Sequence, residues 1–197
     1  MKAMVKFYIV MALAAILISF TSSAQHANLG VKGGVNVYNI QNDNGSKYDA
    51  KLGLHLGLLG HIHLDKEWAL QPELVYSGQG AKYNISNSET KVNLDYINFP
   101  VLLQYMFDNG FRLQAGPQVG FLISAKAETN QNKIDVKDNY KGIDFGIGLG
   151  GGYINTNSGF GIDARYNVGL SDITEGNSVK SMNRGFQLGV FYQFKHS

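Results

Sequence analysis

Three histidines fall on one side of a single alternating segment, and imidazole is a common metal ligand. His55, His61 and His63 share the same parity within residues 51–63, and two imidazoles at i and i+2 are able to hold a metal ion. The chain has no cysteine, and the sequence places no acidic ligand beside the three rings. We therefore interpret them as polar side chains that fill an interior, with no metal or other cofactor.

Charged residues suggest a second kind of chemistry, because a carboxylate beside a cation is a common acid–base pair. Asp163 with Arg165, or Glu73 with an arginine, resembles such a pair in hydrolases embedded in a membrane. Those enzymes usually expose their catalytic groups at an extracellular rim. Here the charges lie within predicted strands, and the polar loops carry no cluster of Ser, His and Asp. The sequence therefore predicts a structural ion-pair network and no enzyme.

Glycines give a third candidate, since Gly146, Gly148 and Gly151 match the G-x-G-x-x-G pattern of dinucleotide-binding proteins. That site needs a strand before the glycines and a helix after them. These glycines lie inside one predicted strand that leads to a turn. The pattern therefore does not indicate a nucleotide site.

The segment 160–170 shows which elements position these residues, because apolar and polar side chains alternate along it without a slip. Successive side chains on a strand point to opposite faces, so the segment has one apolar and one polar face. Similar alternation predicts eight strands, at residues 29–38, 51–63, 68–79, 94–107, 111–124, 142–153, 160–170 and 184–194.

The connections between these strands alternate in length. Short turns are expected near residues 65–66, 108–110 and 155–159, and longer polar loops at 40–50, 81–92, 125–140 and 171–183. Short turns on one rim and long loops on the other are typical of outer-membrane barrels, with the turns in the periplasm. We therefore expect an all-β, eight-stranded antiparallel up-and-down transmembrane β-barrel with four extracellular loops and both termini in the periplasm.

The start of the chain indicates export. Residues 1–24 hold two lysines, an apolar run and a small-residue end at Ala24, which is the pattern of a cleaved signal peptide. The barrel domain is then 25–197. Without Lys2 and Lys6 the mature chain has 15 basic and 15 acidic side chains, so no basic stripe suggests nucleic acid.

The polar parity decides which face meets lipid, because a soluble lipid-binding barrel would turn its apolar face inward. Glycine, glutamine and asparagine dominate that parity, whereas lysines concentrate in the loops. The polar parity therefore fits a narrow lumen. Unpaired buried charges are costly, so we predict a plugging network of paired side chains: Lys32, Glu73, Arg112, Asp144, Asp163, Arg165 and Arg184.

Aromatic residues near the ends of the apolar rows predict girdles at the two membrane interfaces. The expected members are Trp68, Tyr76, Tyr105, Phe107, Phe111, Tyr166, Tyr192 and Phe194. Pro72, Pro100 and Pro117 fall inside predicted strands, where each removes a ladder donor. We expect them to mark bulges or strand ends.

Several short pieces together resemble a known family. They are Gly30-Val31-Lys32-Gly33-Gly34-Val35-Asn36, Gln71-Pro72-Glu73-Leu74-Val75-Tyr76-Ser77, Tyr96-Ile97-Asn98-Phe99-Pro100, Ala115-Gly116-Pro117-Gln118 and Ala164-Arg165-Tyr166-Asn167-Val168-Gly169-Leu170. In this order and spacing the chain resembles the PorT-like, porin-family outer-membrane β-barrel proteins of Bacteroidota. The resemblance implies a fold and a place in the cell envelope, and the namesake is linked to protein secretion and gliding.

The expected role is a monomeric, plugged structural or interaction scaffold that works through its loops. Its expected partners are outer-membrane lipids, the barrel assembly machinery and an envelope or secretion protein. The alternatives are a narrow small-solute channel, an accessory component of a secretion system, a membrane-embedded enzyme and a soluble periplasmic lipid-binding barrel.

Overall fold

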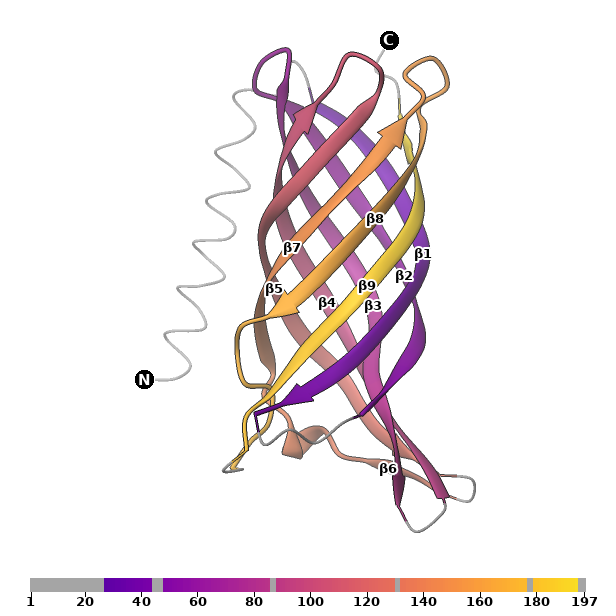
Figure 1. Cartoon of the computed structure of the whole chain (residues 1–197), viewed down its shortest axis with the longest axis vertical. Coiled ribbons are helices and arrows are strands. Elements are labelled where there is room, and N and C mark those ends of the chain that lie inside the picture. Colours follow the sequence, from indigo (N-terminus) through magenta and orange to yellow (C-terminus); the bar gives the residue numbers. More distant parts are fainter. Residues whose placement is uncertain (1–26, 44–47, 86–87, 130–131, 177–178, 195–197) are drawn as a thin grey trace.

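A computed structural model describes residues 27–43, 48–85, 88–129, 132–176 and 179–194. Nearly all of them belong to one sheet that curls into a tall barrel (Figure 1). Its eight long strands are β1 (Ala27–Asn42), β2 (Asp49–His63), β3 (Trp68–Ile85), β4 (Ser88–Met106), β5 (Phe111–Glu128), β7 (Ile143–Ile154), β8 (Phe160–Gly169) and β9 (Ser181–Gln193). The short β6 (Lys133–Asp135) pairs only with β5, and the 3-10 helix η2 (Lys137–Asn139) follows it.

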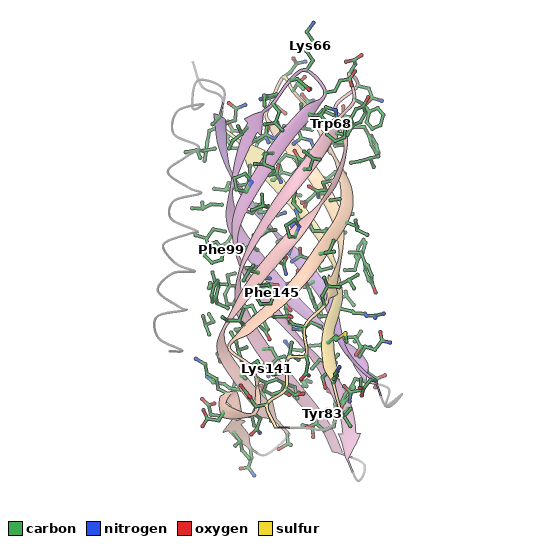
Figure 2. All side chains as sticks on the ribbon, turned by 90° about the vertical axis from the view of Figure 1, so that its left-hand side faces the viewer. Lys66, Trp68, Tyr83, Phe99, Lys141 and Phe145 are labelled. Atoms are coloured by element: carbon green, nitrogen blue, oxygen red, sulfur yellow. The ribbon has the colours of Figure 1, made fainter. Side chains whose placement is uncertain are left out.

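Every neighbouring pair in the barrel is antiparallel, and the pairings run around a closed ring. β1 pairs with β9, and β4 pairs with β5. Closure leaves no free edge along the wall, which is the condition for crossing hydrocarbon with strands. The predicted eight-stranded up-and-down barrel is therefore confirmed. The short turns gather at one end of the barrel, where Lys66 projects, and the long connections gather at the other (Figures 1 and 2).

The apolar parity faces outward. On β2, Leu56 is 67% exposed whereas its neighbour His55 is 3% exposed, and the same contrast recurs around the wall. Such a wide apolar exterior fits lipid and would be unstable in water. The alternative of a soluble barrel with an apolar interior is therefore wrong.

β3 and β4 are longer than the sequence pattern indicated. Residues 81–92 were expected as a polar loop, but 81–85 and 88–92 pair as the two arms of a hairpin in which Lys82 pairs with Lys91 and Ala81 with Val92. Lys82 and Lys91 are compensated by Glu89, at 3.9 and 3.3 Å. The loop was predicted from the polar residues, but a strand that projects into water also carries charge on its outer face.

The three prolines do not mark bulges or strand ends, so that expectation is wrong. Pro72, Pro100 and Pro117 sit inside β3, β4 and β5, and the register is the same on both sides of each. The ladder skips a few positions near Pro72, whose ring packs 3.5 Å from where a Cβ on Gly60 would stand. Register shifts lie elsewhere, between Ala50 and His55 and between Asp95 and Tyr96.

Glycines on β9 make room for large inward side chains. A Cβ on Gly185 would overlap the buried ring of Tyr38, and one on Gly189 would come within 2.8 Å of His55 Nε2. The narrow lumen is thus filled by alternating absent and bulky side chains. No helix in the described part of the chain is long and apolar enough to cross a membrane.

Placing a charge on the outer wall tests the orientation. Leu56→Arg is expected to cost about 2–4 kcal/mol of stability in lipid vesicles, because arginine on a lipid-facing strand position is poorly solvated. Ile134→Arg, at a 60% exposed position on β6, is the control and is expected to change stability little. Urea unfolding of both variants in vesicles measures the difference, and equal stabilities would contradict a lipid-facing β2.

Candidate functional site

Four charged side chains form a compact cluster inside the barrel. Lys32 on β1 lies 2.6 Å from Asp163 Oδ2 and 3.3 Å from Glu73 Oε1. Arg165 on β8 donates two hydrogen bonds to Glu73, from Nη1 to Oε2 at 2.9 Å and from Nη2 to Oε1 at 2.7 Å. The cluster holds two cations and two carboxylates, all nearly excluded from solvent, so its net charge is zero.

The bidentate pair between Arg165 and Glu73 joins opposite walls. In the ring of eight strands, β3 and β8 are separated by β2, β1 and β9 on one side and by β4, β5 and β7 on the other. The ion pair therefore crosses the lumen at its full width and blocks it there.

Glutamines carry the network toward the short-turn end. Gln71 donates to Glu73 at 2.7 Å, Gln104 donates to Gln71 at 3.0 Å, and Arg112 donates to Gln104 at 3.4 Å. Gln104 also donates to Gln114 at 3.0 Å. Arg112 thus belongs to the same network as the central cluster, although it touches the cluster only through amides.

Neutral polar contacts fill the next part of the lumen. His55 shares a hydrogen bond of 2.8 Å with Asn36, which also donates to Ser77 at 2.9 Å. Asn167 on β8 donates to the Tyr38 hydroxyl on β1 at 2.8 Å. These side chains come from four strands, and their hydrogen bonds link those strands across the lumen.

The long-loop end is closed differently. Asp144 accepts hydrogen bonds from Ser171 at 2.6 Å and Asn183 at 2.9 Å. Beyond it lies a buried apolar cluster that sequence reasoning missed, formed by Ile40, Ala81, Val92, Leu94, Tyr96, Leu122, Ala125 and Ile173. A signal for it exists in residues 91–96, where apolar side chains take the inward parity and polar ones the outward parity.

The predicted position of Arg184 is wrong. It was expected in the lumen, but it shares the parity of Phe186 and Leu188, which are about half exposed, so it lies on the outer face of β9. It sits at the long-loop end of the apolar rows, beside Asn39 of β1. The lumen then holds three cations and three carboxylates of the predicted set.

Six of the eight predicted girdle residues lie at the short-turn end. Trp68, Tyr105 and Phe107 form successive edge contacts at 5.1 and 5.0 Å, and Tyr192 contacts Phe194 at 5.4 Å. Two further rings join them, because Phe111 packs on Tyr153 and Phe160 packs on Tyr192. Tyr76 and Tyr166 lie farther along β3 and β8, and the Tyr76 hydroxyl donates to Asp95 at 3.0 Å.

The remaining chemical candidates do not come together as sites. His61 and His63 stack edge to face at 4.6 Å while His55 is bonded to Asn36, and the described residues contain no group of three His, Cys, Asp or Glu able to hold a metal. Gly146, Gly148 and Gly151 all lie within β7, which ends in a turn. Asp163, Arg165 and Glu73 are engaged in ion pairs with one another and with Lys32.

The loop that follows β8 is held by the carboxylate of Asp172. Asp172 contacts Lys141 Nζ at 2.6 Å and accepts hydrogen bonds from the backbone N–H groups of Ser181 and Thr174, at 2.9 and 3.2 Å. Partial burial raises the pKa of Asp172, but these donors outweigh it and hold the pKa well below its usual range. Nearby, burial raises the pKa of Tyr140 to about 12.

A family model for the outer membrane protein beta-barrel domain matches residues 22–175. The chain belongs to this family. Ail, the attachment invasion locus protein of Yersinia pestis, superposes on this outer-membrane barrel with a TM-score of 0.55 and 16% identity, covering 86% of this chain and 100% of Ail. The Neisserial surface protein NspA gives a TM-score of 0.59 and 15% identity, with the same coverage. Both likenesses concern the fold. No curated protein matches the sequence.

Removing one member of the central cluster tests its energetic weight in this outer-membrane barrel. Glu73→Gln would leave Lys32 and Arg165 with only Asp163, and breaking a buried pair in this way costs about 3–5 kcal/mol. Glu89→Gln removes an exposed pair and is expected to cost about 0–1 kcal/mol. Denaturant unfolding in detergent micelles compares the two, and similar losses would argue against a cluster that stabilises the barrel.

Protonating Asp172 tests the loop fastening. Because its folded pKa is depressed, the contribution to stability is complete above the ordinary Asp pKa of about 3.9 and is lost as the pH falls toward the folded pKa. Asp172→Asn should therefore increase protease cleavage in residues 170–180 at neutral pH, with the barrel intact. Wild-type protein should show that cleavage only in acid, as read by an acid-active protease. Cleavage that is the same in both proteins at neutral pH would refute the role of the carboxylate.

Proposed function

We propose that this outer-membrane barrel is a plugged structural or interaction scaffold that presents its long-loop end to partners outside the cell, and that it is not an enzyme. The observation that carries the proposal is the bidentate Arg165–Glu73 pair between opposite walls. Polar contacts and an apolar cluster fill the lumen on its loop side. A barrel filled in this way offers solutes no continuous water path, which leaves its surface as the part able to act.

The loop end has the build of an interaction surface. The β3–β4 hairpin projects beyond the rim together with the end of β5 and β6 (Figure 1). Exposed ion pairs cover it, such as Lys133 with Glu128 at 3.6 Å, and the apolar cluster supports it from within. Exposed, charged projections of this kind suit recognition of an envelope or secretion protein.

We also propose a finer placement, as a PorT-like member from Bacteroidota that acts as a monomer. The order of the sequence pieces around Lys32, Glu73 and Arg165 supports it. The proposed signal peptide, residues 1–24, lies outside the described residues. The described chain ends, Ala27 and Phe194, lie at the short-turn end, which supports termini in the periplasm. Assembly into lipid would then use the barrel assembly machinery.

Planar bilayers test the plug directly. Purified wild-type protein is expected to insert without conductance steps of nanosiemens size, because the central cluster occupies the full width of the lumen. Single-channel recording measures this, with a known open porin as the positive control for insertion. Regular steps of that size would overturn the scaffold and favour the small-solute channel.

A further inference from the structure

Arg112 differs from the other lumen arginine in lacking a carboxylate partner. Its side chain points inward from β5 and is 4% exposed. Its hydrogen bond to Gln104 is long, at 3.4 Å, and the guanidinium carbon lies 5.4 Å from the centre of the Phe191 ring. Among the described residues no Asp or Glu lies within ion-pair distance of it, whereas Arg165 contacts both Glu73 and Asp163. A buried cation without a counter-charge is costly unless something else supplies one.

Arg112 lines a hollow at the short-turn mouth of the barrel. The cavity measures about 480 Å³, and His61, His63, Lys66 and Gln193 also line it. Figure 2 shows Lys66 at this end of the molecule. The cavity therefore opens toward the short-turn side and ends inward at the arginine.

Three residues that line this cavity each carry a buried polar atom without a hydrogen-bond partner in the described protein. The atoms are Arg112 Nε, Gln193 Nε2 and His61 Nδ1. The first two are donors, and the third donates in the tautomer that carries the proton on Nδ1. Buried donors are almost always satisfied, so the two unsatisfied donors from β5 and β9, with the His61 ring nitrogen from β2 beside them, indicate an acceptor that the described residues do not provide.

The charges around the cavity favour an anion. Arg112 and Lys66 are cations, and both His61 and His63 are able to donate. Among the described residues that line the cavity, Asp108 is the carboxylate, and it is exposed on the turn after β4. A cation as ligand would meet Arg112 at the closed end and be repelled.

We propose that this mouth cavity binds a phosphate group. A tetrahedral phosphate presents oxygens in several directions and can accept from donors on three strands, whereas a carboxylate offers two oxygens in one plane. Arginine pairs well with phosphate because its planar fork donates two parallel hydrogen bonds. The cavity has room for a small organic group attached to the phosphate, so free phosphate and a phospholipid headgroup share the chemistry that the site recognises. The site goes beyond the scaffold role and does not depend on it.

The chain offers a clean readout, because it contains three arginines, Arg112, Arg165 and Arg184. The full mature barrel is refolded in a phosphate-free maltoside detergent, and the three ¹⁵N-labelled Nε–H signals are followed by NMR during titration with inorganic phosphate. The Arg112 signal is expected to move and saturate, while those of Arg165 and Arg184 stay in place. Sodium chloride at equal ionic strength controls for screening and should leave all three unmoved.

A matched pair of variants gives a second measurement. Arg112→Gln keeps a side chain able to bond Gln104 but removes the charge, and it should weaken phosphate binding by roughly tenfold or more, as expected for the loss of a charged hydrogen bond. Arg184→Gln makes the same substitution on the outer face and should bind phosphate as the wild type does. Isothermal titration measures both, after heat-modified gel migration has shown that each variant is folded.

The outcomes separate the proposal from its alternatives. An Arg112 signal in the wild type that ignores phosphate overturns the site even where Arg112→Gln fails to fold, and so does equal movement of the Arg184 signal. A second arm replaces inorganic phosphate with short-chain phosphatidic acid below its micelle concentration. Tenfold tighter binding of the lipid assigns the site to a headgroup, and equal binding assigns it to free phosphate.

Discussion

The interior of this barrel depends on one ion pair that spans it. Arg165 and Glu73 reach each other from strands on opposite walls, and Lys32 and Asp163 complete a neutral cluster. The four charges of this cluster can be buried because each has its counter-charge, and Glu73 accepts a further hydrogen bond from Gln71. The surrounding glycines and amides follow from that requirement, since long charged side chains meet at the centre of a narrow barrel only where their neighbours are small.

Along its axis the barrel has one part that faces lipid and one part that faces water. From Tyr96 toward the short-turn end, the outward side chains of β4 are apolar. From Tyr96 toward the hairpin with β3, the outward side chains are polar, while Val92, Leu94 and Tyr96 itself point inward. β4 continues across this position, but its apolar side chains change from the outward face to the inward face. The register shift between Asp95 and Tyr96 falls at the same place. A membrane-embedded part with a polar interior thus passes directly into a projecting part with an apolar one.

Much of the fold follows from alternation alone, because a closed barrel makes period two visible in every strand. The number of strands, their order and the outward apolar face could all be predicted from residues such as Leu52, Leu54 and Leu56. The projecting hairpin could not, because charge at Lys82 and Lys91 looks the same on a loop and on a solvated strand. The partners of Glu73 were also beyond the sequence, since alternation gives the side of the wall and not the height at which side chains meet. Arg184 was misplaced although its parity, shared with Phe186, was readable.

The cluster also lies across the junction between the first and last strands. Lys32 belongs to β1, and Asp163 belongs to β8, on the far side of β9. Glu73 lies on the same side of this seam as Lys32, so the Lys32–Asp163 contact is the one that depends on pairing of β1 with β9. The contact between Lys32 and Asp163 therefore exists only where the first and last strands are paired, so the same side chains that fill the lumen also hold together the seam at which the barrel closes.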